Sequence, residues 1–236
     1  MITGNLGSIV VAGAAGKALE EINASDVTLI TLLVDRSSSI GDRRLTQAVR
    51  EGQNALVDAF AGARERDSVL MALWTFGTDA QVLHGYVSVD DAVKLDGSNY
   101  RPGGSTRLYD TWCDALAANA TYAQRLRDGG IPCRSVVVVV TDGEDVGSKR
   151  TAGDCAQVSS QLLATEQFTL AFVGVGKDVD FHAVAKAMGV PDGCVLVQQD
   201  ATPSALRAAF AMVSRSAIRA SQGRIAPGAK AGFFTP

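Results

Sequence analysis

The strongest structural signal in the chain is Val27-Thr28-Leu29-Ile30-Thr31-Leu32-Leu33-Val34-Asp35-Arg36-Ser37-Ser38-Ser39. Residues 27–34 form a nearly continuous apolar run, which is typical of a β-strand that is buried on both faces. Asp35, Ser37 and Ser39 follow directly, so a carboxylate and two hydroxyls would lie at the C-terminal end of this strand. Open α/β sheets place their binding crevices at that end. Oxygen ligands of this kind suit Mg²⁺ better than zinc.

Two later segments carry side chains of the same chemistry at similar places. Gly103-Gly104-Ser105-Thr106 is a glycine-rich loop before a helical pattern, and it presents the Thr106 hydroxyl. The apolar run from Val136 to Val140 predicts another buried strand, and Asp142 follows it. Taken alone, Asp35, Ser37 and Ser39 could simply cap the following helix. The addition of Thr106 and Asp142 at matching element ends favours a metal site built by all five residues.

These five positions match a known motif, and the chain here resembles the von Willebrand factor A (vWA) family with its metal-ion-dependent adhesion site (MIDAS). The flanking residues from Tyr100 to Asp110 and from Val140 to Glu144 agree with the family's usual pattern. The resemblance covers about residues 25–215. Within the family, the compact form and residues 210–218 look most like small bacterial proteins of tellurite-resistance and stress operons.

The resemblance implies a role for each of the five residues. Ser37, Ser39 and Thr106 would contact the ion directly or nearly so, whereas Asp35 and Asp142 would act partly through bound water. With few direct carboxylates the metal stays electrophilic and keeps one position for an acidic group from outside. The expected ion is Mg²⁺, with Mn²⁺ or Ca²⁺ as alternatives. The expected partner is a protein that presents an Asp or Glu side chain.

The rest of the pattern predicts an α/β fold. Near-continuous apolar runs indicate buried strands, and residues 80–87 partly alternate, which suggests an antiparallel edge strand after a hairpin. Helical patterns lie between the runs, so we expect a three-layer, Rossmann-like vWA fold with a mostly parallel central sheet and helices on both faces. The predicted strands are 27–34, 69–76, 136–140, 168–175 and 194–197, and the predicted helices lie around 45–60, 108–126, 154–165, 181–188 and 203–218.

The chain is interpreted as one domain with two extensions. Residues 1–24 form an N-terminal extension, 25–219 the vWA domain, and 220–236 a flexible C-terminal tail. Phe233 and Phe234 in this tail could dock on a partner or on the domain itself.

Composition narrows the class of protein. The net charge of −3 and the scattered Arg and Lys residues argue against a nucleic-acid surface. The four cysteines form no C-x-x-C pair and have only His84 and His182 as companions, so a zinc site is not expected. Residues 1–16 lack the charged start of a secretory signal, and no apolar run approaches the length of a membrane helix. We therefore expect a cytoplasmic protein with reduced thiols and no membrane contact.

Catalytic motifs are weak in this sequence. A haloacid-dehalogenase phosphatase would need a second Asp where Ser37 stands, and no G-x-S-x-G elbow is present. Residues 13–18 fail as a phosphate loop because Ala18 replaces Ser or Thr. The leading hypothesis is a non-enzymatic adaptor, with two alternatives: a Mg²⁺-dependent hydrolase on the same type of fold, or a structural protein that assembles with itself through the metal.

Near the candidate metal site, Asp110 is expected to make a structural hydrogen bond. Glu144 and Asp145 are expected to cap or solvate their loop, and Arg36 and Arg107 to be solvated or to meet an acidic partner.

Overall fold

The computed structural model describes residues 6–223 and 232–234. Its centre is a single sheet in the order β3-β2-β1-β4-β5-β6, in which every neighbouring pair is parallel except β2 with β3. The mostly parallel sheet with one antiparallel edge strand confirms the predicted fold class. The strands are β1 (Val27–Asp35), β2 (Val69–Phe76), β3 (Ala80–Ser88), β4 (Cys133–Thr141), β5 (Phe168–Val175) and β6 (Val195–Gln198).

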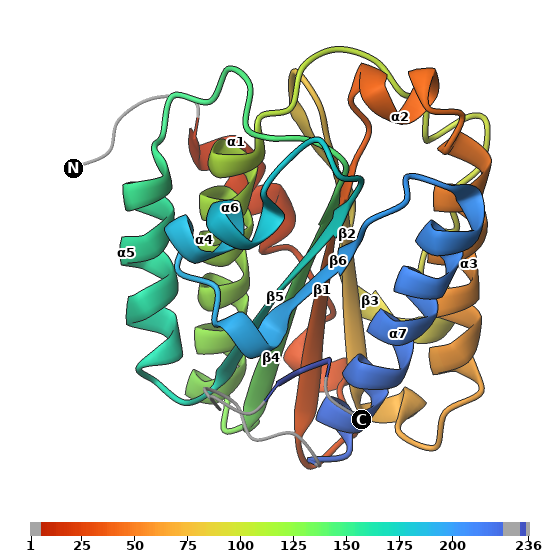
Figure 1. The fold of residues 1–236 in the computed structure, drawn as a ribbon. Helices are drawn as coiled ribbons and strands as arrows, with labels where there is room; N and C mark the ends of the chain where they lie inside the picture. Colours follow the sequence, from red (N-terminus) through yellow and green to blue (C-terminus); the bar gives the residue numbers. More distant parts are fainter. Residues whose placement is uncertain (1–5, 224–231, 235–236) are drawn as a thin grey trace.

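Helices cover both faces of the sheet (Figure 1). On one face α3 packs along α7, and on the other α4 lies between α1 and α5. This gives the three layers that the alternation of strands and helices predicted. The helices are α1 (Leu6–Gly13), α2 (Ser38–Asp42), α3 (Thr46–Ala61), α4 (Leu108–Asp128), α5 (Ala152–Leu163), α6 (Phe181–Ala187) and α7 (Pro203–Ser221). No helix within residues 6–223 combines the length and the apolar character that a bilayer crossing requires.

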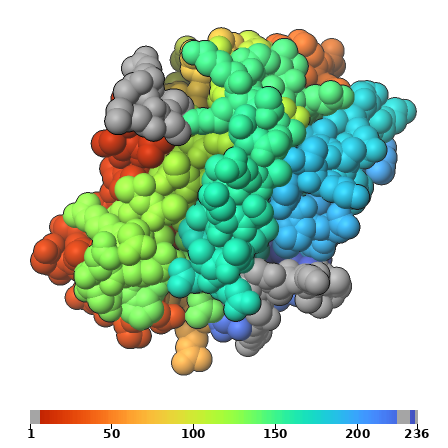
Figure 2. Space-filling view, turned by 90° about the vertical axis from the view of Figure 1, so that its left-hand side faces the viewer, coloured from red at the N-terminus to blue at the C-terminus, as the bar shows by residue number. Residues whose placement is uncertain are grey.

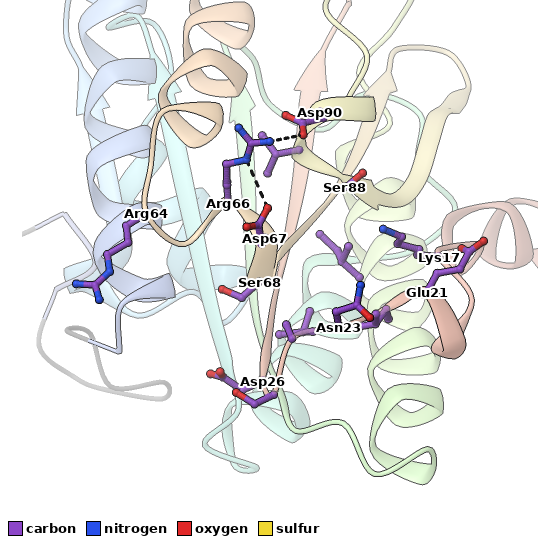
Figure 3. A pocket seen from close by; sticks show the side chains of 16 residues that line it. Lys17, Glu21, Asn23, Asp26, Arg64, Arg66, Asp67, Ser68, Ser88 and Asp90 are labelled. Carbon is purple, nitrogen blue, oxygen red and sulfur yellow. Dashed lines mark hydrogen bonds and ion pairs between the residues drawn. The ribbon is translucent and has the colours of Figure 1, made fainter.

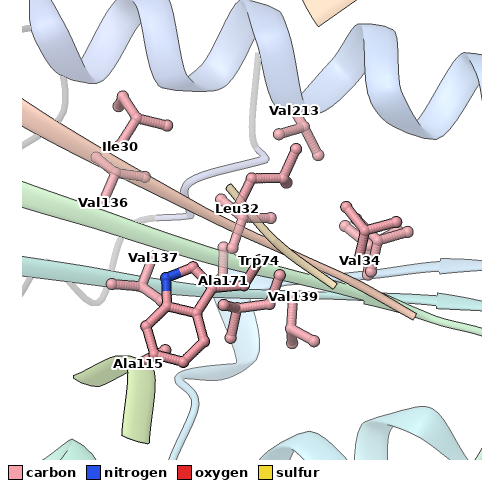
Figure 4. Packing of buried hydrophobic residues seen from close by; sticks show 14 of the residues in the cluster. Ile30, Leu32, Val34, Trp74, Ala115, Val136, Val137, Val139, Ala171 and Val213 are labelled. Carbon is pink, nitrogen blue, oxygen red and sulfur yellow. The ribbon is translucent and has the colours of Figure 1, made fainter. Parts of the chain in front are cut away.

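The apolar side chains of the central strands point alternately to the two helical layers (Figure 4). Ile30 and Leu32 of β1 lie toward Val213 of α7, whereas Trp74 and Val137 lie on the side of Ala115 of α4. All nine residues of β1 are buried, which explains why the sequence shows a continuous apolar run rather than an alternating one. Burial on both faces fixes β1 in the middle of the sheet, and with it the position of Asp35 at its end.

Two helix starts show how local sequence sets the element boundaries. Thr202 caps α7, since its hydroxyl accepts a hydrogen bond from the Ala205 amide, and the helix begins at Pro203 as predicted. The predicted start of α5 was two residues too far along the chain, because the helix begins at Ala152 and not at Asp154. Thr151 is its N-cap, and the Asp154 side chain bonds back to the Thr151 amide in a capping box.

Described residues outside 25–219 pack against the domain. Helix α1 contacts α4 and β3, and the segment after it extends the sheet edge, where the Tyr86 amide donates to the Ala15 carbonyl at 2.8 Å. Gly85 permits this approach, because a Cβ there would lie 2.1 Å from that carbonyl oxygen. At the other end of the chain, Phe233 is fully buried and contacts Phe234 edge-on, so both aromatics dock on their own fold. Parts of the two predicted extensions, residues 1–5, 224–231 and 235–236, lie outside the described residues.

Candidate metal centre

The five predicted ligands meet at the C-terminal edge of the sheet, beside α2 near the top of Figure 1. Asp35 is the last residue of β1, Ser37 is the N-cap of α2, and Ser39 lies in the first turn of that helix. Asp142 follows β4, the neighbour of β1, and Thr106 precedes α4. Parallel pairing of β1 with β4 brings the two carboxylates to the same edge.

Hydrogen bonds join these side chains across large distances in sequence. The Ser39 hydroxyl donates to Asp142 Oδ1 at 2.7 Å and lies 3.0 Å from the Ser37 hydroxyl. Asp35 Oδ1 accepts from the Ser37 amide at 2.7 Å, and its Oδ2 accepts from the Thr141 hydroxyl at 2.6 Å. Hydroxyls and one backbone amide thus hold the two carboxylates in place.

The glycine loop is fastened to the same cluster through its backbone. The Gly103 amide donates to the Arg36 carbonyl at 2.7 Å, and the Gly104 carbonyl accepts from the Ser38 amide at 3.1 Å. Gly104 has φ +83°, a conformation that favours glycine, and a Cβ there would lie 2.2 Å from the Thr78 hydroxyl oxygen. This loop sets the position of Thr106.

Thr106 is also attached to the segment after β4. Its carbonyl accepts a hydrogen bond from the Val146 amide at 2.7 Å. Its hydroxyl faces Gly143, where an added Cβ would stand 3.7 Å away. Thr106 therefore lies against the residue next to Asp142, and all five predicted residues fall into one cluster.

Burial makes the two carboxylates costly to ionise without a cation. Asp35 is 1% exposed, and burial is the main cause that raises its pKa to about 6, against the opposing hydrogen bonds from Thr141 and Ser37. Burial also raises the pKa of Asp142 above its usual value, although hydrogen bonding from Ser39 and the charge of Arg43 oppose the shift. A bound divalent cation would relieve both penalties.

The donor set fits a hard cation. It consists of carboxylate and hydroxyl oxygens alone, the ligands that Mg²⁺, Mn²⁺ and Ca²⁺ prefer. Asp142 Oδ2 is buried and accepts no hydrogen bond within the described residues. Arg43 Nη1 lies 3.3 Å from this oxygen but directs its hydrogen bond to the Asp142 carbonyl, 3.0 Å away. A buried carboxylate oxygen that has an ion-pair contact but accepts no hydrogen bond still has lone pairs free for a metal ion.

Three residues at the site were not predicted from the sequence. Arg43 lies between Asp142 and Asp178, whose carboxylate it contacts at 3.1 Å. Thr141 holds Asp35, and the buried Tyr100 donates its hydroxyl to the Asp35 carbonyl at 2.5 Å. Arg43 could have been predicted from its spacing, because a residue four positions after Ser39 lies on the same side of a helix.

The neighbours that were predicted have mainly structural contacts. Asp110 accepts from the Lys149 and Arg150 amides, which confirms the expected structural hydrogen bond. Asp145 accepts from the Tyr109 amide at 3.0 Å and so caps the first turn of α4. Arg36 donates to the Asp79 carbonyl at 3.3 Å. For Glu144 and Arg107, a role in binding stays a prediction.

A cavity of about 650 Å³ lies at the opposite end of the sheet (Figure 3). It opens beside Val27 and Ser68, where β1 and β2 begin, and it is lined by charges of both signs. Arg66 is already paired with Asp90 at 2.7 Å and with Asp67 at 3.4 Å. β1 separates this cavity from the carboxylate cluster by nine residues, roughly 30 Å of strand.

The protein is thus a three-layer α/β domain with an oxygen-lined cluster at the carboxyl edge of its sheet. The profile of the von Willebrand factor type A domain matches residues 30–210, and the chain belongs to this family. Domains of this family are protein-interaction modules, often with a MIDAS, and in general they do not act as enzymes.

Solved structures with the same fold come from distant relatives. The proximal thread matrix protein 1 of the mussel byssus is 18% identical, with a TM-score of 0.56 over 83% of this chain and 46% of its own. A further structure of that protein, with a zinc-occupied MIDAS motif, has a TM-score of 0.55 and 18% identity over 85% of this chain and 47% of its own. The ArnB paralog VWA2 of Sulfolobus acidocaldarius is 17% identical, with a TM-score of 0.53 over 79% of this chain and 45% of its own. This chain therefore spans less than half the length of these structures. The comparison with curated proteins gave no match.

Arg43 provides a test of the charge balance at the site. We expect Arg43→Gln to bind Mg²⁺ about fivefold more tightly. The Arg43 side chain is 27% exposed, so solvent screens its guanidinium, and its repulsion of a divalent ion costs roughly 1 kcal/mol. Isothermal titration calorimetry would measure the dissociation constant, with Arg64→Gln at the far end of the sheet as the control. Equal or weaker binding by Arg43→Gln would mean that Arg43 helps to hold Asp142 in place.

Proposed function

We propose that this protein is a non-enzymatic adaptor that binds a protein partner through a divalent cation. Asp35, Ser37, Ser39, Thr106 and Asp142 hold the ion, and an Asp or Glu side chain of the partner completes its coordination. The observation that carries the proposal is the buried oxygen cluster in which Asp142 Oδ2 lacks a hydrogen bond. Membership of a family of interaction modules supports it.

The proposed ion is Mg²⁺, with Mn²⁺ or Ca²⁺ as alternatives. Neutral hydroxyls supply three of the five side chains, so a divalent ion would keep part of its charge for an incoming carboxylate. The zinc-occupied MIDAS of the mussel protein supports a divalent ion at the equivalent place. Calorimetric titrations with each ion would rank them, and binding of none would remove the proposal.

The proposed setting is the bacterial cytoplasm, in a stress-response system of the tellurite-resistance type. This part of the proposal rests on the resemblance of residues 210–218 to small bacterial proteins of such operons. Identification of the partner tests it directly. A partner from an unrelated system would overturn the setting without affecting the metal site.

The central experiment is an affinity pull-down from native lysate, read by mass spectrometry. Wild type, Asp35→Ala and Thr106→Val would each be used in Mg²⁺ and in EDTA. We expect a partner to be retained only by the wild type in Mg²⁺. Thr121→Val is a matched control for Thr106→Val, because Thr121 is exposed on α4 and its hydroxyl bonds only within that helix. Equal recovery under all conditions would contradict metal-bridged binding. If the wild type alone retains a partner in Mg²⁺, substitution of the partner's acidic residues would locate the contact.

A further inference from the structure

Two cysteines from different helices lie in contact beneath the surface that α4 and α5 share. Figure 2 shows α5 lying along α4 on this face. Cys113 lies in the second turn of α4 and Cys155 in the first turns of α5, and their sulfur atoms are 3.6 Å apart. Both side chains are buried, with Cys113 5% exposed and Cys155 0%. A disulfide needs about 2.05 Å, so closure requires a shift of roughly 1.5 Å between the two sulfur atoms.

The surroundings make the two thiols chemically unequal. Hydrogen bonding between the Cys113 and Cys155 thiols and the positive charge of Arg150 lower the pKa of Cys113, although its burial acts in the opposite direction. Arg150 is held in place by an ion pair with Asp114 at 2.8 Å. Cys155 contacts the Tyr109 carbonyl at 3.6 Å, and its pKa is raised. Cys113 is therefore the better nucleophile, and Cys155 lies where a resolving thiol is required.

The other two cysteines have different surroundings. Cys133 bonds to the Ala123 carbonyl at 3.4 Å, and burial raises its pKa. Burial also raises the pKa of Cys194, which lies directly before β6. Among the described residues, neither is in hydrogen-bond contact with another thiol. Both serve as internal controls for the reactivity of Cys113 and Cys155.

We propose that Cys113 and Cys155 form a reversible, peroxide-responsive disulfide that links α4 to α5. The Cys113 thiolate attacks hydrogen peroxide, the O–O bond breaks, and a sulfenic acid and, after protonation, water are formed. The Cys155 thiol then attacks this sulfur, releasing a second water as the S–S bond forms. The protein loses two electrons and two protons, and one peroxide is reduced to two waters. A dithiol reductant reverses the step.

The cross-link would join the two segments that carry predicted metal ligands. Thr106 lies just before α4, and Asp142 lies on the segment that leads to α5. These segments are already joined by the hydrogen bonds of Asp110 to the Lys149 and Arg150 amides. The disulfide would turn this non-covalent connection into a covalent one. Its formation does not depend on the proposed adaptor function.

Peptide mapping tests the proposal, because trypsin separates all four cysteines. Cys113 falls in peptide 108–125, Cys133 in 128–134, Cys155 in 151–177 and Cys194 in 187–207. Reduced, folded protein would be treated with hydrogen peroxide, blocked with an alkylating agent and digested without reductant. We expect peptides 108–125 and 151–177 to appear as one cross-linked species about 2 Da lighter than their sum. The cysteines of peptides 128–134 and 187–207 should be alkylated and not cross-linked. Dithiothreitol should restore 108–125 and 151–177 as separate peptides.

Cys113→Ser and Cys155→Ser should each abolish the cross-linked species, whereas Cys133→Ser should retain it. Circular dichroism would establish that each variant is folded, and the wild-type map stands even if one variant is not. Alkylation of Cys113 and Cys155 as complete as that of Cys194 after peroxide treatment would overturn the proposal. Sulfinic acid at Cys113 without the cross-link, or a cross-link to Cys133 or Cys194, would overturn it as well.

Discussion

Asp35→Asn is expected to stabilise the metal-free protein at pH 7 by about 3 kcal/mol and to abolish its stabilisation by Mg²⁺. Burial raises the pKa of Asp35 from 3.8 to about 6, and each pKa unit corresponds to about 1.4 kcal/mol. At pH 7 the wild type must keep a buried carboxylate ionised, and Asn removes that charge. The substitution fits locally, since the Thr141 hydroxyl also lies 3.2 Å from the Gly143 carbonyl and can donate there instead.

The pH dependence has a definite sign. Because the folded state holds the Asp35 proton more tightly than the unfolded state, the contribution of Asp35 to the free energy of unfolding of the metal-free protein falls as pH rises from 3.8 to about 6. It stays low above that range. Mg²⁺ binds the ionised carboxylate of the folded state, so its stabilising effect should grow as pH rises through the same interval. In Asp35→Asn the fall with pH should be smaller, and the part due to Asp142 should remain.

Urea denaturation in EDTA and in Mg²⁺, repeated between pH 4 and pH 7.5, would measure both effects. Asp67→Asn is the matched control, because its side chain is 92% exposed and lies at the other end of β2. A lower stability of Asp35→Asn in EDTA would contradict the assignment of the pKa shift to burial. A Mg²⁺ effect equal to that of the wild type would remove Asp35 from the metal site.

Asn119→Ala is expected to lower the free energy of unfolding by about 3 kcal/mol. Asn119 on α4 is fully buried, donates to the Thr31 hydroxyl of β1 at 3.0 Å, and accepts from the Ser135 hydroxyl of β4 at 2.6 Å. The Thr31 hydroxyl also lies 2.6 Å from the Tyr86 hydroxyl of β3. Truncation would leave Ser135 and Thr31 incompletely paired in the core, and each such group costs about 1 to 3 kcal/mol.

Chemical denaturation would measure the loss, with the exposed Asn23→Ala as the control. The double variant Asn119→Ala, Ser135→Ala should recover part of the loss, because the unpaired hydroxyl is then gone. A change below about 0.5 kcal/mol for Asn119→Ala would show that water takes the place of the amide. The network would then not hold α4 to the sheet.

The strands and the candidate ligands could be predicted because their signals are local. Burial of β1 on both faces is recorded in the sequence as an unbroken apolar run, and parallel strands end at a common edge. The sequence thus predicted Asp35 and Asp142 at the ends of two buried strands, and the structure shows that these strands, β1 and β4, are neighbours. The helix boundaries were less accurate, as the start of α5 shows, because a capping box decides them at the level of single hydrogen bonds.

Contacts between distant residues needed the tertiary structure. Helix α1 is short and has few polar positions to mark a face, so its place against α4 and β3 depends on its neighbours. The role of Arg43 depends on the approach of Asp142 and Asp178, which lie 99 and 135 residues away in the sequence.

The pairing of buried polar groups and thiols likewise needed the tertiary structure. Asn119 meets Thr31 across 88 residues, and Cys113 meets Cys155 across 42. By itself the sequence determined the strands, the longer helices between them and the residue types at the sheet edge, because periodicity and short motifs act over a few residues. Only the tertiary structure decided which polar groups pair and which buried oxygen accepts no hydrogen bond, because those outcomes depend on packing between elements that are far apart in the chain.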